Sequence, residues 1–249
     1  MTRTLIAALA LATVTAAPAT AGTYTLGFGS LPSAQGWTYL TQGGGAGIPD
    51  SNLYTATGSS LTQNTMGIPM TSGGHNYYLR PVTITAGADF SLKVRARVSA
   101  FEGLAFGGGT NYPFGMFFTV GTTTGYSIMG ISGSRFGYLD AAGAVAYGDY
   151  APGFDITAFN DYAITRTAGL TRLSVNGTTL ASFVATPLGG DSLEFGDGTG
   201  FGNAAGEYSS LVFRSGAVPE PASWAMLVTG FGIVGGTLRS RRRAMVTAG

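Results

Sequence analysis

Apolar and polar residues alternate along much of the region between residues 22 and 216, where no convincing helical periodicity is found. The clearest case is FSLKVRARVSAF at 90–101, which puts apolar side chains on one face and Lys93, Arg95 and Arg97 on the other. Such alternation is expected of a strand with one buried and one solvated face. The pattern therefore predicts strands for this region.

Further strand signals follow along the chain. Two apolar runs, 112–120 and 125–132, are separated by the turn-like GTTT, and Asn176-Gly177 lies between two alternating runs. Asn-Gly predicts a two-residue hairpin, because a type I′ turn needs positive φ at both central residues. About a dozen short strands with glycine turns predict an all-β fold, an antiparallel jelly-roll sandwich over 22–216. The less regular segment 23–80 is expected to supply its first strands and long loops.

The composition excludes some kinds of site and makes one class of partner unexpected. The 249 residues include no cysteine, which excludes disulfides, thiolate zinc sites and cysteine nucleophiles. Between residues 22 and 218 there are eight basic and eleven acidic residues. A nucleic-acid partner is not expected, because phosphate binding requires a basic patch that this balance disfavours.

The first 21 residues have the layout of a secretory signal peptide. Arg3 is followed by an apolar stretch at 5–14 and by small residues that include Ala19 and Ala21. We expect export by the general secretion machinery and cleavage by signal peptidase after Ala21. An uncleaved anchor is the alternative, although the apolar run is short for a bilayer span.

The C-terminal end has the opposite layout. Residues 222–238 carry no charge, and a helix over that length reaches about 26 Å, just short of a hydrocarbon core. The cluster at 239–243 contains Arg239, Arg241, Arg242 and Arg243. Positive residues stay on the cytoplasmic side, so we expect a single transmembrane helix at 222–238 and a short cytoplasmic tail at 244–249. A buried core helix is the alternative.

Residues 217–243 resemble a known sorting signal. Pro219, Glu220 and Pro221 are followed by Trp224 and Ala225, then by the glycine-rich apolar run and the arginines. This order resembles the PEPxxWA variant of the PEP-CTERM sorting domain of Gram-negative bacteria. The resemblance implies processing by an exosortase, transient anchoring in the inner membrane, and release to the cell surface or extracellular matrix of a bacterium that makes exopolysaccharide.

A second resemblance covers residues 158–216, in which a hairpin, a strand, a glycine loop and a closing strand follow one another. This stretch is similar to the second half of a concanavalin A-like, laminin-G-like jelly roll. Such domains often hold one calcium ion, which takes oxygen ligands. The candidate ligands in or beside the glycine loops are Asp191, Asp197, Asn203 and Glu207. The alternative is that these residues only form turns, and no other cofactor is expected.

Catalytic patterns are weak. His75 is the only histidine, and no Gly-x-Ser-x-Gly elbow accompanies it as a serine triad would require. Asp191, Glu194 and Asp197 are three residues apart, so neighbouring carboxylates in a strand would point to opposite faces. A glycosidase needs two carboxyl groups that flank one bond. No catalytic residue is therefore predicted.

Two groups of side chains leave a role in binding open. Lys93, Arg95 and Arg97 either face an acidic polysaccharide or form a solvated strand face. Several aromatic residues are candidates for stacking on sugar rings, namely Trp37, Tyr77, Tyr78, Tyr112 and Tyr138. The sequence alone does not indicate which of them are exposed.

The expected function is that of a non-enzymatic surface or matrix protein that binds, or is embedded in, exopolysaccharide. The alternative is a surface carbohydrate-active enzyme, either a glycan hydrolase or a lyase on a jelly-roll scaffold. A third hypothesis is a structural matrix component without a specific small ligand.

Overall fold

The computed structural model describes residues 22–216, except for 72–73, 86, 104, 107–109, 112, 123–124, 132–134, 186–189 and 200. The predicted signal peptide at 1–21 and the segment 217–249, with the sorting motif and the expected transmembrane helix, lie outside the described residues. No helix in the described part of the chain is long and apolar enough to cross a membrane.

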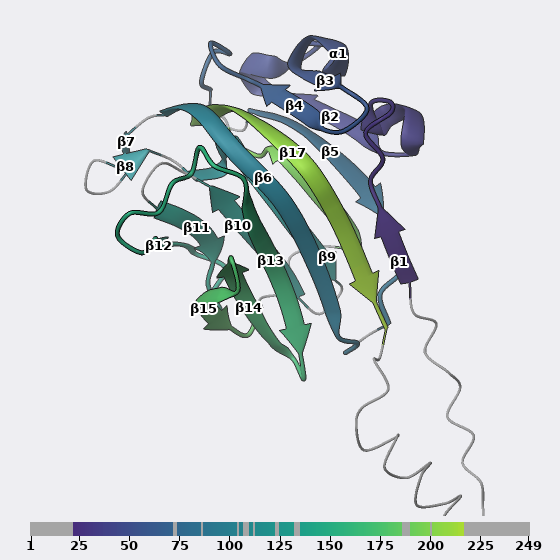
Figure 1. The fold of residues 1–249 in the computed structure, drawn as a ribbon, viewed down its shortest axis with the longest axis vertical. Coiled ribbons are helices and arrows are strands. Elements are labelled where there is room, and N and C mark those ends of the chain that lie inside the picture. Colours follow the sequence, from purple (N-terminus) through teal and green to yellow (C-terminus); the bar gives the residue numbers. More distant parts are fainter. Residues whose placement is uncertain are drawn as a thin grey trace, which may run out of the picture.

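The larger of two antiparallel sheets, sheet A, has eight strands (Figure 1). Seven of them follow the spatial order β15 (Thr178–Phe183), β14 (Leu170–Val175), β13 (Asn160–Thr167), β6 (Phe90–Gly103), β17 (Gly202–Ser215), β4 (Leu61–Asn64) and β3 (Tyr54–Ala56). The eighth, β1 (Gly22–Thr25), pairs with the end of β17, so both ends of the described chain lie at the same corner.

The second sheet, sheet B, has seven strands. Their order is β12 (Val145–Asp149), β11 (Arg135–Leu139), β10 (Gly125–Ile131), β9 (Met116–Thr122), β16 (Ser192–Asp197), β5 (His75–Pro81) and β2 (Thr38–Gln42). A small hairpin of β7 (Ala105–Phe106) and β8 (Thr110–Asn111) stands apart from both sheets. The helical elements are single turns: η1 (Pro32–Gln35), η2 (Gly43–Gly45), α1 (Asp50–Leu53) and η3 (Pro113–Gly115).

The main hydrophobic core lies between the two sheets. Strand β6 contributes Leu92 and Val94, which are almost fully buried, and β9 contributes Phe118 and Val120 from the opposite sheet. Alternate residues of a strand point to opposite faces, so each inward apolar residue turns its neighbour outward. The antiparallel two-sheet sandwich expected from the sequence is confirmed.

Three local predictions can be compared with the structure. In β6 the apolar face is buried and Lys93, Arg95 and Arg97 are exposed, as predicted. The hairpin at Asn176-Gly177 is confirmed: φ is 49° at Asn176 and 81° at Gly177, and β14 pairs with β15 across the turn. The apolar run predicted to form a strand from residue 112 begins as a strand only at Met116, because Pro113–Gly115 forms a 3-10 turn.

Candidate functional site

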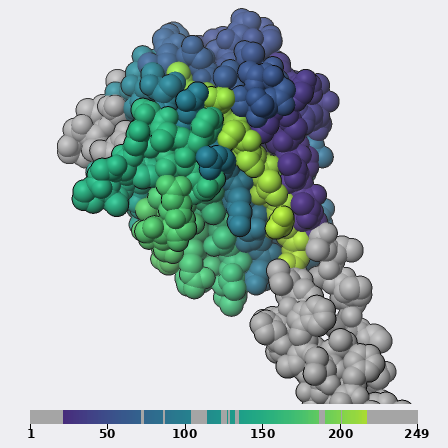
Figure 2. Space-filling view, in the orientation of Figure 1, coloured from purple at the N-terminus to yellow at the C-terminus, as the bar shows by residue number. Residues whose placement is uncertain are grey.

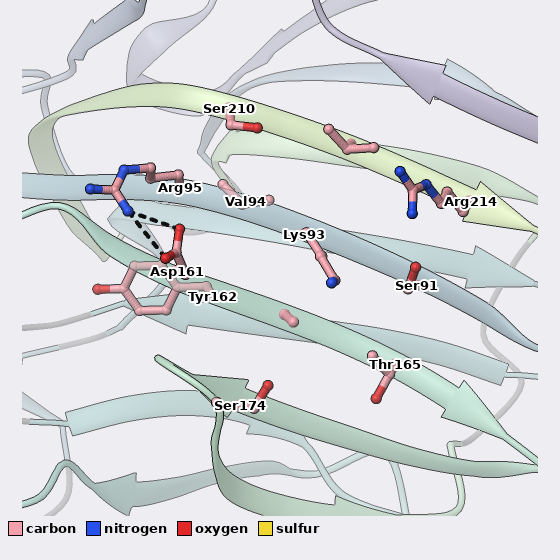
Figure 3. A pocket seen from close by; sticks show the side chains of 13 residues that line it. Ser91, Lys93, Val94, Arg95, Asp161, Tyr162, Thr165, Ser174, Ser210 and Arg214 are labelled. Atoms are coloured by element: carbon pink, nitrogen blue, oxygen red, sulfur yellow. Dashed lines mark hydrogen bonds and ion pairs between the residues drawn. The ribbon is translucent and has the colours of Figure 1, made fainter.

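A groove lies over the outer face of sheet A. It encloses about 540 Å³ and is lined from four strands, β14, β13, β6 and β17. In Figure 2 the stripe of β17 runs down this face, with β13 to β15 on one side and β1 on the other. Because Leu92 and Val94 point into the core, Ser91, Lys93 and Arg95 point outward into the groove (Figure 3).

Strand register arranges the outward residues in rows across the sheet. One row runs through Ser174, Ala163, Lys93 and Val212 on successive strands. The next row runs through Arg172, Thr165, Ser91 and Arg214. The face is therefore built of small and hydroxyl side chains with cations placed among them.

Two of the arginines on this face are held in ion pairs. Both carboxylate oxygens of Asp161 accept hydrogen bonds from Arg95 at 3.1 Å. Glu207 accepts hydrogen bonds from Arg97 at 3.0 and 2.7 Å, and hydrogen bonds from Ser60 and Arg97 lower its pKa. The ring of Phe159 lies beneath both guanidinium groups, at 5.8 Å from Arg95 and 4.8 Å from Arg97. The charges of Arg95 and Arg97 are thus compensated locally.

Three exposed cations on the same face have no such partner. Among the residues that the structure describes, Lys93, Arg172 and Arg214 form no ion pair. The rows from Ser91 to Arg97 contain five cations and two carboxylates. The cations are Lys93, Arg95, Arg97, Arg172 and Arg214, and the carboxylates are Asp161 and Glu207. The face therefore carries three surplus positive charges in a region whose acidic residues outnumber its basic ones.

The outer face of sheet B carries a different group of side chains. His75 and Tyr77 are half-buried neighbours on one face of β5, with ring centroids 5.7 Å apart. The ring of Tyr77 meets Phe117 of β9 edge to face at 5.6 Å. Glu194 of β16 lies diagonally across from Tyr77, since Gly196 pairs with Tyr77 and Glu194 with Leu79. An imidazole, a phenol and a carboxylate thus lie along this face, with Tyr77 between the other two.

Burial sets the electrostatics of this second group. The Glu194 residue is only 8 % exposed and accepts a hydrogen bond from Ser192 at 2.9 Å. Burial, together with the nearby charge of Glu194, raises the pKa of Tyr77. Thr119, directly opposite Glu194 on β9, is fully buried, and its hydroxyl has no hydrogen-bond partner in the described part of the chain. Buried polar atoms usually have partners, so this centre of sheet B is unusual.

The acidic residues at 191–197 are oriented as their spacing predicted. Leu193 and Phe195 belong to the core, so Glu194 points to the outer face of sheet B. Asp197 points inward instead, towards the core residues Tyr54 and Tyr208, whose pKa values are raised by burial and further by this carboxyl group when it is ionised. These two carboxyl groups of β16 therefore do not flank a common site.

The four candidate calcium ligands bind separate partners. Asp191 accepts a hydrogen bond from the Ile84 amide at 3.0 Å, and Glu207 pairs with Arg97. Asn203 donates to the Ile68 carbonyl and to Glu102, and Asp197 is buried inside the sandwich. Across residues 22–216, outside the gaps given above, no group of three or more acidic or histidine side chains is placed to hold a metal ion. The expected set is not brought together.

The aromatic candidates for sugar stacking are divided by the fold. Trp37 and Tyr78 are in the core, at 4 % and 0 % exposure, so these two candidates are not available to stack on a sugar. Tyr138 is half-buried and stacks on Phe183, and Tyr112 lies outside the described residues. Of the four that the structure describes, Tyr77 combines partial exposure with a place beside acid–base groups.

The sequence matches no protein-family model and no curated protein. The fold, however, is similar to solved structures. One is an alginate lyase, AlgAT5 from Polysaccharide Lyase family 7, with a TM-score of 0.50 at 8 % identity over 74 % of this chain and 96 % of that one. Another is an endo-β-1,3-glucanase from Pyrococcus furiosus, with a TM-score of 0.53 at 14 % identity over 78 % of this chain and 94 % of that one.

These similarities correct the functional expectation. The non-enzymatic surface protein expected from the sequence is contradicted, because the two solved structures named above, a lyase and a glucanase, are both enzymes. At such low identities the similarity concerns the β-sandwich itself, and the chemistry has to be argued from this chain's own residues.

Proposed function

We propose that this protein is a carbohydrate-active enzyme, a glycan hydrolase or lyase on a jelly-roll scaffold. Cleavage would take place on the outer face of sheet B. The observation that carries the proposal is the position of Tyr77, which lies between His75 and Glu194 on one face and beside the ring of Phe117. Cleavage of a glycosidic bond breaks a carbon–oxygen bond, and the leaving oxygen must take a proton.

Each of the three groups has a role that its chemistry suits. A raised pKa keeps the Tyr77 phenol protonated, so that it is available to protonate the leaving oxygen. The imidazole of His75 has a ring nitrogen that can accept a proton. Glu194 lies close enough to act on Tyr77 electrostatically, and its negative charge stabilises positive charge that develops nearby. Tyr77 also offers a sugar the edge of an aromatic surface.

The groove on sheet A is less suited to the cleavage step. Its lining carboxylate, Asp161, is bound to Arg95, and Glu207 on the same face of the sheet is bound to Arg97. Tyr162, which contributes to the lining, is buried, with 1 % of its surface exposed. Proton transfer needs a group that is free to change its protonation state, so the outer face of sheet B is favoured.

Removal of one hydroxyl tests the proposal. We expect purified wild-type protein to shorten at least one member of a panel of acidic and neutral polysaccharides, and Tyr77→Phe to lose about a hundredfold or more of that activity. New reducing ends report either route of cleavage, and ultraviolet absorbance of an unsaturated sugar identifies a lyase. Tyr138→Phe removes the same atom from a tyrosine outside this group and should retain activity.

The test has clear negative outcomes. Full activity in Tyr77→Phe, His75→Gln and Glu194→Gln would place the chemistry elsewhere on the molecule. Thermal unfolding of each variant separates a lost proton donor from a lost fold. A wild-type protein that leaves the whole panel intact would contradict the enzymatic proposal itself.

We also propose that the chain is exported and then sorted through its C-terminal segment. The support is the sequence: the signal-peptide layout that ends at Ala21, the Pro219-Glu220-Pro221 motif, and Arg239 with its neighbouring arginines. In this proposal signal peptidase removes the N-terminal segment, and an exosortase acts on the tail while the chain is held in the inner membrane. The protein would then reach the cell surface or an exopolysaccharide matrix.

Mass spectrometry of the mature protein from its own host tests the sorting proposal. We expect a mature N-terminus at Gly22 and loss of the residues that follow the Pro219–Pro221 motif. A protein that still ends at Gly249 would contradict processing. Replacement of Glu220 by alanine is expected to leave the tail uncut, whereas Thr247→Ala, beyond the arginines, should not affect processing.

A further inference from the structure

We propose that the groove on the outer face of sheet A is a binding site for an acidic polysaccharide, separate from the proposed cleavage site on sheet B. It would hold the protein on an anionic polymer while the opposite face is free to act. The inference rests on the charge and register of sheet A, and it stands independently of whether sheet B carries out the cleavage.

The first support is the segregation of charge. Of the eight basic residues between 22 and 218, five lie in the rows from Ser91 to Arg97 on this face, whereas only two of the eleven acidic residues lie in these rows. A neutral solvated face would mix both signs, as most protein surfaces do. A surplus of cations in a groove instead attracts anionic ligands and raises their local concentration.

The second support is which cations remain available. Arg95 and Arg97, already bound to Asp161 and Glu207, are poorly placed to take up another anion. Lys93 stands between Arg95 and Arg214 in Figure 3, and both Lys93 and Arg214 are exposed lining residues. Lys93 and Arg214, without an ion-pair partner among the described residues, are therefore the groups that we assign to the anion.

The third support is the spacing of the cations. Arg214 and Arg172 lie in one row but are separated by β6 and β13, a distance of about 14 Å at the usual strand separation. Lys93 lies in the adjacent row on β6, between them. Positive charges spread over this distance suit a linear polymer with repeated negative groups better than one small anion.

The side chains between the cations favour a sugar over other polyanions. Ser91, Thr165, Ser174 and Ser210 provide hydroxyl groups that both donate and accept hydrogen bonds, as sugar hydroxyls require. Single-stranded nucleic acid binds on exposed aromatic rings, but among the described lining residues the only aromatic one, Tyr162, is buried. Insertion into a membrane would need exposed apolar residues, and Val184, which is not in the groove, is the one large exposed hydrophobic residue described.

The binding experiment uses polygalacturonate as the acidic probe and dextran as the neutral one. We expect full-length wild-type protein to bind polygalacturonate with an affinity that falls as salt is added, and to bind dextran weakly. The double variant Lys93→Gln with Arg214→Gln should bind polygalacturonate about tenfold or more weakly, because two charge-assisted contacts are lost. Lys93→Arg with Arg214→Lys keeps both charges and should retain most of the affinity.

Several results would overturn the inference. Equal binding of polygalacturonate by the neutral double variant and the wild type would remove Lys93 and Arg214 from the site. Equal binding of dextran would remove the role of charge. Tighter binding to single-stranded DNA or to phosphatidylglycerol vesicles would assign the groove to another class of polyanion.

Cleavage is measured on the same proteins to keep the two proposals apart. The neutral double variant should still cleave a short oligosaccharide substrate at the wild-type rate, since neither residue belongs to the group around Tyr77. Tyr77→Phe should bind polygalacturonate as the wild type does. Loss of binding without loss of cleavage therefore supports the groove proposal, and the reverse pattern supports the sheet B proposal.

Discussion

Replacing Phe195 by alanine is expected to lower the free energy of unfolding by about 3–5 kcal/mol, the range typical of a buried phenylalanine. Phe195 is fully buried in β16, the strand that lies between β9 and β5. Its ring centroid lies 4.9 Å from Trp37, 5.4 Å from Tyr78 and 5.2 Å from Tyr208. The substitution removes one ring from contact with three others and leaves a cavity among rigid side chains that cannot easily close it.

Chemical denaturation at equilibrium measures this loss directly. Val184→Ala is the matched control, because Val184 is 64 % exposed and its truncation should change stability by less than about 0.5 kcal/mol. A loss below about 1 kcal/mol for Phe195→Ala would show that the aromatic cluster repacks around the gap. Because β16 also carries Glu194, the same variant should reduce the activity proposed for sheet B.

Asp197→Asn is expected to stabilise the protein at neutral and alkaline pH and to remove a pH dependence that the wild type has. Burial raises the pKa of the Asp197 carboxyl well above its ordinary value near 3.8, although hydrogen bonds from Thr65 and Thr199 act in the opposite direction. One carboxyl oxygen of Asp197 has no hydrogen-bond partner within the described residues. The folded protein therefore keeps this group protonated where the unfolded chain has already released its proton.

The sign of the effect follows from proton linkage. The stability that depends on this proton is fully present below the ordinary pKa and is lost as pH rises towards the folded pKa. Between the two pKa values the loss is about 1.4 kcal/mol per pH unit. Asparagine cannot ionise, so the variant and the wild type should be closest at about pH 4 and diverge by about pH 8.

Thermal unfolding as a function of pH measures the difference between the two proteins. Asp155 is a useful comparison, because hydrogen bonds from Thr157 lower its pKa and Asp155→Asn should have a small effect of opposite sign. If Asp197→Asn and the wild type melt in parallel across the whole pH range, Asp197 does not retain its proton in the fold. The outcome also bears on calcium, since a protonated, buried carboxyl group is a poor ligand for that ion.

Much of the sandwich was predictable from local pattern. In β6 the alternation of apolar and charged residues is a property of the strand itself and predicted both its faces. The Asn176-Gly177 turn was equally local, because its backbone conformation depends on two residues. The strand that begins at Met116 was misjudged at its start because an apolar run does not reveal a 3-10 turn at its proline.

The candidate sites were predictable only in part. The absence of a nucleophile elbow argues against His75 as the base of a serine triad, and it gives no sign of the contact between His75 and Tyr77. The spacing His-x-Tyr in an alternating strand does indicate a shared face. The cations Lys93, Arg95 and Arg97 were recognised together. The sequence does not show that Arg95 and Arg97 are paired with carboxylates whereas Lys93 is not. These pairs depend on Asp161 and Glu207, which are 66 and 110 residues away from their partners.

The sequence by itself determined the class of fold, the faces of the long strands, the hairpin at Asn176 and the opposite orientations of Glu194 and Asp197. These properties depend on neighbouring residues, and the period of two in an extended chain makes them readable. The tertiary structure alone decided which strands pair. Pairing of β6 with β17 places Arg214 beside the row of Lys93, and pairing of β16 with β5 brings Glu194 to Tyr77. These residues become neighbours because both sheets bury their apolar faces in one core. Strand pairing of this kind joins distant parts of the chain, so the local sequence pattern does not predict it.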